Sequence, residues 1–303
     1  MSAPVAELQA AIAAGSQSFA AAARLMPPGI REDTVMLYAW CRHADDVVDG
    51  QTLGGSPEAM GDPAARLARL KAETLVALHG SGPLSPPFAA LRAVARRHDF
   101  PERWPMDLID GFAMDVAGRD YRTLNDTLDY AYHVAGVVGV MMARVMGVRD
   151  PEVLDRACDL GLAFQLTNIA RDVVEDARIG RVYHPREWLD AAGAEICGEI
   201  PSPALHAVIL RLLDAAEPYY ASAFAGLPAL PPRCAWSIAA AARIYRAIGT
   251  RIRHGGPEAY RRRISTSGLA KTGLALRGLG DAAASRIAPP TASRDGLWTR
   301  PRA

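Results

Sequence analysis

Apolar residues recur every three or four positions along most of the chain, and Gly or Pro separates one such segment from the next. This spacing is typical of amphipathic helices, whereas the apolar positions of a half-buried strand alternate. Runs of β-branched residues are few, while Ala, Leu and Arg, which favour helices, are common. The pattern predicts an all-α protein with helices at about 6–25, 32–49, 62–80, 88–98, 106–116, 123–146, 150–176, 185–193, from 203 onward with a kink at Pro218, 232–254 and 269–279.

The helices form one uninterrupted series, without an internal repeat or a linker between halves. A chain of 303 residues, half of them hydrophobic, can bury a substantial core. We therefore predict a single helical domain over residues 1–287. Residues 288–303 are rich in Pro and Arg, which predicts a disordered tail.

The first candidate site is an acidic cluster, Asp45, Asp46 and Asp49, within an apolar segment. A charge in such a setting is costly to bury without a partner. Asp45 and Asp49 lie four residues apart, so on a helix their carboxylates share one face and repel each other. Divalent cations with oxygen ligands remove that conflict. Arg42, on the same face, is placed to reach a phosphate oxygen.

A second acidic stripe lies more than a hundred residues later. Its members carry amide or carboxylate oxygens and fall on one helical face: Gln165, Asn168, Asp172 and Asp176. Their neighbours are apolar, and Arg171 stands beside Asp172 as a second candidate phosphate ligand. For either cluster alone, a solvated acidic face is the alternative. Together the two clusters predict divalent metal ions that hold a diphosphate.

That arrangement favours ionisation of an allylic diphosphate, because metal ions neutralise the charge that develops on the leaving group. The resulting carbocation needs a dry pocket that does not quench it. The segment VAGVVGVMMARVMG, residues 134–147, offers apolar walls with small residues at Ala135, Gly136 and Gly139. A long chain could approach the backbone there. Tight packing between helices is the alternative for these small residues.

Charge and cysteine usage narrow the class of protein. The net charge is +1, but ten Arg or Lys and a single acid fall within residues 233–277. This region is either a solvated basic face or a surface for diphosphate or anionic lipid. No nucleic-acid motif accompanies it, which argues against nucleic acid as a partner. Four dispersed Cys, no signal-peptide pattern and no apolar run of spanning length predict a cytoplasmic protein, at most peripheral to a membrane.

Several longer segments carry a family resemblance. The most specific are LYAWCRHADDVVDGQTLG and LGLAFQLTNIARDVVEDARIGRVYHPREWL, and the others are GSQSFAAAARL, DGFAMDVAGRDYRTLNDTL, YAYHVAGVVG, YRAIG and RRISTS. From Gly15 to about Gly280, the chain resembles the squalene/phytoene synthase family. The resemblance implies the all-α isoprenoid synthase fold, a single-domain helical bundle around a central cavity.

The resemblance also implies roles for individual residues. Those that match the family's Mg²⁺-binding aspartate motifs and their surroundings, where Mn²⁺ is an alternative ion, are Asp45, Asp49, Asn168, Asp172 and Asp176. Those that match substrate-binding positions are Ser16, Ser18, Tyr38, Arg42, Gln165, Asn168, Arg171 and Tyr245. Tyr130 joins the four aspartates as a catalytic match.

The activity that the resemblance implies is head-to-head condensation of two geranylgeranyl diphosphates, through a cyclopropyl diphosphate, to phytoene. No NADPH is expected to take part. A sister enzyme that uses farnesyl diphosphate to make dehydrosqualene, presqualene diphosphate or squalene stays open, because one sequence does not show the pocket length. A head-to-tail prenyltransferase or terpene cyclase and a non-catalytic scaffold are further alternatives. The presence of all four aspartates argues against the scaffold.

Overall fold

A computed structural model describes residues 21–50, 62–262 and 264–302 of the chain. Within these ranges every regular element is a helix, so the predicted all-α class is confirmed. Most of the first predicted helix, 6–25, and both Ser16 and Ser18 lie outside the described residues.

The helices follow the predicted order, and many begin with Pro in the first turn, where its missing N–H costs nothing. The first described are α3 (Pro28–Asp49), α4 (Pro63–His79), α5 (Pro86–His98) and α6 (Arg103–Val116). The central elements are α7 (Leu124–Ala131), the π-helix η2 (Tyr132–Gly136), α8 (Val137–Val145) and α9 (Pro151–Arg178). The last are α10 (Arg186–Ala192), α11 (Pro203–Ala225), the 3₁₀ helix η3 (Leu227–Ala229), α12 (Pro232–Gly255), the 3₁₀ helix η4 (Gly256–Arg261) and α13 (Gly268–Ile287).

The largest departure from the predicted elements is the helix expected over residues 123–146. It starts as predicted, since the Thr123 hydroxyl accepts a hydrogen bond from the Asp126 amide and the Asp126 carboxylate accepts one from the Thr123 amide, at 3.3 and 2.8 Å. The π-helix η2 then separates α7 from α8. At the other end of the chain, α13 continues to Ile287 rather than ending near residue 279.

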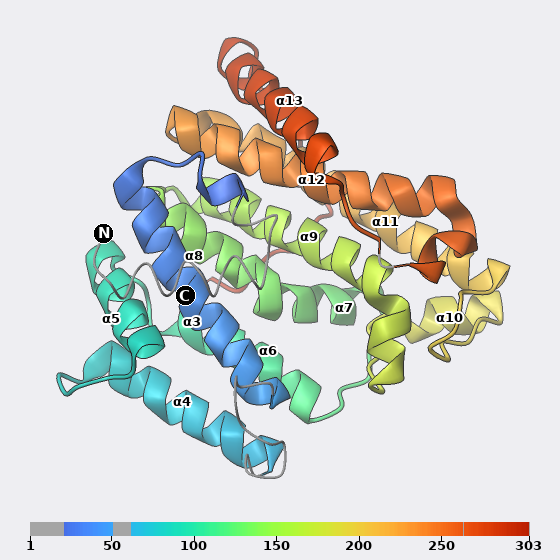
Figure 1. The fold of residues 1–303 in the computed structure, drawn as a ribbon, viewed down its shortest axis with the longest axis horizontal. Coiled ribbons are helices and arrows are strands. Elements are labelled where there is room, and N and C mark those ends of the chain that lie inside the picture. The colour runs from blue at the N-terminus through green and yellow to red at the C-terminus, as the bar shows by residue number, and fades with distance from the viewer. Residues whose placement is uncertain (1–20, 51–61, 263, 303) are drawn as a thin grey trace.

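Helix α9 lies at the centre of the bundle. It packs against α8, α11, α12 and η2, and Figure 1 shows it between α12 and α13 on one side and α3 on the other. Its inward side chains Leu162, Leu166 and Ile169 are almost completely buried. Burial of each such side chain stabilises the fold by about 1.5–3 kcal/mol. Because α9 is packed on several sides, its polar stripe has a fixed position.

The segment η2–α8 meets α9 through close contact of the backbones. A Cβ atom added at Gly139 would lie 2.4 Å from the carbonyl oxygen of Ala157, and one added at Gly161 would lie 2.4 Å from that of Ala135. Gly136 faces Cys158 in the same contact. Tight helix packing, the alternative noted for the small residues of this segment, is therefore present.

The described part of the C-terminal tail, residues 288–302, differs from the predicted disorder. Arg300 is 8 % exposed and its guanidinium donates to Asp155 of α9 at 2.7 Å, while Arg294 pairs with Asp159 of the same helix. The expectation of disorder rested on composition alone, which takes no account of where the arginines of the tail find partners. Their partners lie on α9, so the tail packs against the domain.

We expect the Gly161→Ala substitution to destabilise the protein. The added methyl group meets backbone rather than a movable side chain, and overpacking of this kind costs about 1–3 kcal/mol. Thermal unfolding would show a Tm lowered by several degrees. Gly273→Ala in α13 is the matched control, because an added Cβ there has nothing within 4 Å and Ala favours the helix. Equal Tm values for the two variants would contradict the close contact.

Candidate functional site

A largely apolar cavity of about 310 Å³ lies between η2–α8, α9 and α12. Its apolar walls include Val138, Met142, Leu160, Phe164 and Ile238. The polar groups that reach it are Tyr38, Gln165, Asn168, Ser237 and Tyr245, together with the long side chain of Arg156. On α9 the lining residues run from Asn168 back to Val153, a distance of about 22 Å at 1.5 Å per residue. A long apolar chain with a polar head fits this shape.

The small residues predicted to line such a pocket divide into two groups. Ala135 and Gly139 line the cavity as predicted. Gly136 does not appear among the lining residues and is instead buried against Tyr132 and Cys158.

The first aspartate cluster lies in the last turns of α3, a helix that ends at Gly50 in the left-handed conformation. Arg42 forms ion pairs with Asp45 at 3.2 Å and with Asp46 at 2.6 Å. Burial and the neighbouring Asp49 nevertheless raise the pKa of Asp45 to about 6. The cluster therefore carries more negative charge than Arg42 neutralises.

The second cluster lies near the C-terminal end of α9. Arg171 donates to Asp172 through both its Nε, at 2.7 Å, and its Nη2. Burial first, and Asp172 second, raise the pKa of Asp176 to about 7. Asn168 donates to Gln165 at 3.3 Å, but its own side-chain oxygen is buried and accepts no hydrogen bond from the described residues. Because Asn168 lines the cavity, this unpaired oxygen is a candidate ligand for a group bound there.

Arg181 connects the two clusters and was not among the predicted site residues. It follows α9, and its Nη2 lies 2.7 Å from the Asp49 carboxylate of α3, 132 residues away in the sequence. Its positive charge also opposes the raised pKa of Asp45 and of Asp176. A guanidinium so placed brings the two acidic clusters to one site.

Asp115 of α6 is a second residue that the sequence did not single out. It accepts hydrogen bonds from Tyr130 at 3.0 Å and from Tyr183 at 2.9 Å, and the two tyrosine rings stack with centroids 4.5 Å apart. Burial raises the pKa of Asp115, and Arg181 opposes that effect. Tyr130 is thus anchored to Asp115, and it is not among the residues that line the cavity. Both Asp115 and Arg181 lie in segments that carry the family resemblance, which was the available signal.

The remaining predicted residues fall at the cavity or outside the described part. Tyr38 of α3 and Tyr245 of α12 line the cavity, and Tyr245 stacks on Phe164 with ring centroids 4.1 Å apart. Ser16 and Ser18 belong to residues that the structure does not describe. The roles assigned to all these residues stay predictions. The predicted residues that line the cavity are Tyr38, Gln165, Asn168 and Tyr245.

The donor set suits a divalent cation that is shared with a phosphate ligand. Within residues 21–50, 62–262 and 264–302, no three His, Cys, Asp or Glu side chains already converge on one point. Mg²⁺ seldom requires such a cage, since it is commonly held by one or two carboxylates together with substrate phosphates and water. Two crowded carboxylate pairs and the unsatisfied oxygen of Asn168 meet that requirement.

Comparison with known proteins identifies relatives over nearly the whole chain. The family model for squalene/phytoene synthase matches residues 12–270. A 15-cis-phytoene synthase from Paracoccus sp. (strain N81106 / MBIC 01143) is 75 % identical over 291 residues, which cover 96 % of each chain. A 15-cis-phytoene synthase from Pantoea ananas is 48 % identical, again over 96 % of each chain.

Solved structures share the fold. A dehydrosqualene synthase in complex with a ligand is 27 % identical, covers 93 % of this chain and 97 % of its own, and superposes with a TM-score of 0.81. A squalene synthase from Alicyclobacillus acidocaldarius has a TM-score of 0.73 over 84 % of this chain and 94 % of its own. At 24 % identity, the latter speaks for the fold alone.

The crowding at the second cluster predicts a pH-dependent stability. Asp176 keeps its proton up to about pH 7 in the folded protein, against an ordinary pKa of 3.8, so the free energy of unfolding falls as pH rises between these values. Without divalent ions, Asp176→Asn should therefore raise the Tm at pH 8 by about 2 °C or more. The gain should shrink toward pH 5, where the native carboxyl is protonated. Thermal unfolding in EDTA measures both. Asp190→Asn, at an exposed ion pair of α10, is the control. A Tm gain for Asp176→Asn that does not depend on pH would contradict the raised pKa of Asp176.

Proposed function

The chain belongs to the squalene/phytoene synthase family, and we propose that it acts as a phytoene synthase. In this reaction one geranylgeranyl diphosphate ionises with loss of diphosphate, and the C2=C3 bond of a second captures the cation. Loss of a proton then closes the ring to give a cyclopropyl diphosphate. That intermediate ionises, rearranges and loses a proton, which yields phytoene and two diphosphates in all. The observation that carries the proposal is 75 % identity to a 15-cis-phytoene synthase over 96 % of both chains.

Arginines at the two clusters are suited to hold the diphosphates. Arg42, Arg171 and Arg181 each lie against one of the aspartates, so their forked guanidinium groups already face the site. A guanidinium binds phosphate through two parallel hydrogen bonds, which fixes orientation as well as charge. A diphosphate would compete with the aspartates for these groups, and that exchange brings the leaving group between the clusters.

Mg²⁺ is the cofactor we propose, with Mn²⁺ as an alternative. The residues that would hold it are Asp45, Asp49, Asn168, Asp172 and Asp176. When bound, it supplies positive charge that stabilises the departing diphosphate. The crowding that raises the pKa of Asp45 and of Asp176 makes a cation favourable there.

The cavity would protect the carbocation. Its lining is mainly apolar, which keeps water away from a reactive cation. The stacked rings of Phe164 and Tyr245 line the cavity, with Phe164 about one helical turn from Asn168 on α9, and aromatic faces attract positive charge. Tyr130 is not among the lining residues, and its hydroxyl donates to Asp115. The groups that line the cavity orient the prenyl chains without reacting with them.

Farnesyl diphosphate is the alternative substrate, and it would place the chain with the sister enzymes that make C30 products. A geranylgeranyl chain has five more carbons than a farnesyl chain, and each buried methylene contributes about 0.8 kcal/mol. A cavity lined over about 22 Å of α9 therefore favours binding of the longer chain. We also propose that no NADPH is consumed.

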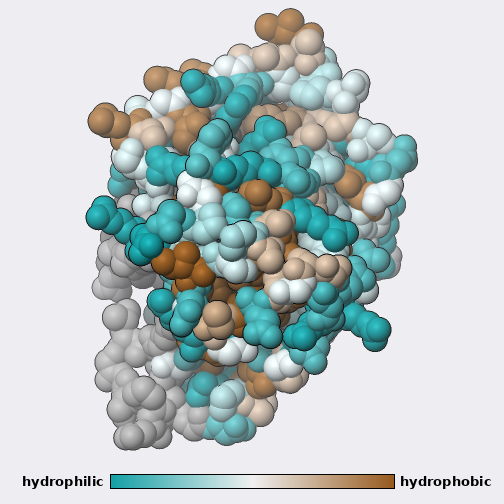
Figure 2. Space-filling model, turned by 90° about the vertical axis from the view of Figure 1, so that its right-hand side faces the viewer, coloured by the Kyte–Doolittle hydropathy of each residue, from teal (hydrophilic) through white to brown (hydrophobic). Residues whose placement is uncertain are grey.

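A second proposal concerns a membrane surface. No helix in the described ranges is long and apolar enough to cross a bilayer. On α13, however, Leu269, Leu276 and Ile287 are 90, 62 and 87 % exposed and share one face. The charged residues exposed on this helix are Arg277 and Arg286. Figure 2 shows apolar residues at the surface at the upper edge of the molecule, the level at which α13 lies in Figure 1. Apolar and basic groups together favour anionic lipid.

We expect purified protein with Mg²⁺ to convert geranylgeranyl diphosphate into a C40 hydrocarbon without NADPH. Farnesyl diphosphate should give little product, because it fills less of the cavity. Product identification by chromatography and mass spectrometry measures both. A C30 product from farnesyl diphosphate would reassign the substrate, and a reduced product that forms only with NADPH would indicate squalene synthase.

The matched inactive controls for this assay are Asp45→Asn and Asp172→Asn. Each should abolish turnover with little loss of helix content, because each removes a repelling charge from the end of a helix rather than part of the core. Circular dichroism checks the fold. Unchanged rates under saturating Mg²⁺ would count against the two-cluster site.

For the membrane proposal, the protein should float with anionic vesicles at low salt and less at high salt. Leu276→Glu should weaken this binding, since it places a negative charge on the apolar face of α13. Val76→Glu on α4 is the matched control, because Val76 is also half exposed but lies on another helix. No flotation at low salt would contradict the proposal.

A further inference from the structure

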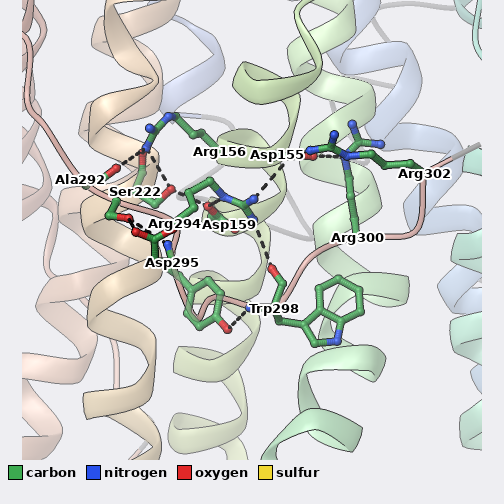
Figure 3. Close-up of polar contacts among 12 residues, drawn as sticks. Asp155, Arg156, Asp159, Ser222, Ala292, Arg294, Asp295, Trp298, Arg300 and Arg302 are labelled. Atoms are coloured by element: carbon green, nitrogen blue, oxygen red, sulfur yellow. Dashed lines mark hydrogen bonds and ion pairs between the residues drawn. The ribbon is translucent and has the colours of Figure 1, made fainter.

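The C-terminal segment, residues 292–302, is bound to α9 by buried ion pairs (Figure 3). The side chains of Asp155 and Asp159 are 2 and 0 % exposed, deeper than either aspartate cluster of the site. Arg294 donates to both oxygens of Asp159, at 2.7 and 2.8 Å. Arg300 donates to Asp155 at 2.7 Å, and Arg302 pairs with the same carboxylate. Two buried charges of α9 thus depend on the last residues of the chain.

The same segment also contacts the helices on either side of α9. The backbone N–H of Trp298 donates to the Tyr219 hydroxyl of α11 at 3.2 Å, and the Trp298 ring lies 5.3 Å from that of Tyr132 in η2. Arg103 of α6 donates to the carbonyl oxygen of Arg302 at 3.3 Å. The segment is therefore held at both ends against the outside of the cavity wall.

Arg156 links this segment to the cavity. Among the lining residues in the described part of the chain it is the one with a charged side chain. Its Nη1 donates to the carbonyl oxygen of Ala292 at 3.1 Å, and to the carbonyl and hydroxyl oxygens of Ser222 at 3.2 and 3.3 Å. The Ser222 hydroxyl in turn donates to Asp159, the partner of Arg294. The guanidinium is thereby bound to the wall and the tail, away from the apolar interior.

The position of Arg156 is at the end of the cavity remote from the aspartates. It precedes Asn168 by twelve residues on α9, about 18 Å along the helix axis. Met146 and Val153 line the cavity in the same region, and Gly226 packs on the stem of Arg156, since an added Cβ there would lie 3.1 Å from the Arg156 Cβ. The stem of Arg156 therefore lies at the far end of the cavity.

We propose that Arg156, fixed by Ser222 and Ala292, forms the end wall of the prenyl cavity and limits the length of chain that binds. This inference rests on the proposed function for its substrate class. Placing the guanidinium in the tail network also keeps a desolvated cation away from a carbocation of the same sign, which it would repel strongly at low dielectric. The C-terminal segment is then part of the substrate site, although it touches no reacting atom.

The test is the binding of unreactive prenyl S-thiolodiphosphates of 15, 20 and 25 carbons, measured by calorimetry with Mg²⁺ on the full chain. Arg156→Ala removes the end wall, so the affinity for the 25-carbon analogue relative to the 20-carbon one should rise about tenfold or more. Arg156→Lys keeps the stem and the charge, and its ratio should stay near that of the unmodified protein. Unchanged ratios in a folded Arg156→Ala variant would overturn the proposal.

A second variant acts in the opposite direction and decides the case if Arg156→Ala fails to fold. Gly226→Ala adds a methyl group against the Arg156 stem and should displace it into the cavity. The 20-carbon analogue should then lose affinity relative to the 15-carbon one by several-fold. An unchanged ratio in this variant would also overturn the proposal. The proposed function fails separately, if the unmodified protein makes no C40 product from geranylgeranyl diphosphate.

Discussion

Four carboxylates of α9 must be accommodated inside an apolar helical bundle, and the rest of the structure depends on the arginines that neutralise them. Asp155 and Asp159 form ion pairs with arginines of the C-terminal segment, and Asp172 forms one with Arg171. The positive charge of Arg181 partly offsets the raised pKa of Asp176. Leaving a buried carboxylate without its partner typically costs about 3–5 kcal/mol. The carboxylates of this central helix are thus partly neutralised by arginines from the loop that follows it and from the end of the chain.

The carboxylates at the two ends of α9 differ in how completely arginines neutralise them. Near its N-terminal end, the pairs are buried and complete, since Asp159 receives two hydrogen bonds from Arg294 and one from Ser222. Near its C-terminal end, compensation is partial, and the pKa of Asp176 is raised to about 7. A completed pair stabilises the fold, whereas an incompletely neutralised one attracts a cationic ligand. The difference separates structural carboxylates from those at the candidate site without reference to any relative.

Local signals in the sequence predicted the helices and the two aspartate clusters, because helix periodicity and i, i+4 spacing are properties of neighbouring residues. They did not predict Arg181, whose contact with Asp49 spans 132 residues, nor the packing of the tail, whose partners lie on α9. The tail was expected to be disordered from composition alone, which takes no account of buried carboxylates elsewhere. The sequence did not predict the π-helix within 123–146 either, since its apolar pattern resembles that of an α-helix.

Because of the π-helix η2, the number of residues in this part of the chain determines which way its side chains face. A π turn holds one residue more than an α turn, and each residue of an α-helix turns the chain by about 100°. Side chains after Gly136 are therefore rotated relative to those before Tyr132, so that Tyr130 faces Asp115 while Val138 faces the cavity. Deletion of one residue would restore a regular α-helix and turn one set of side chains away from its partners. In this segment the number of residues, as much as their identity, encodes the site.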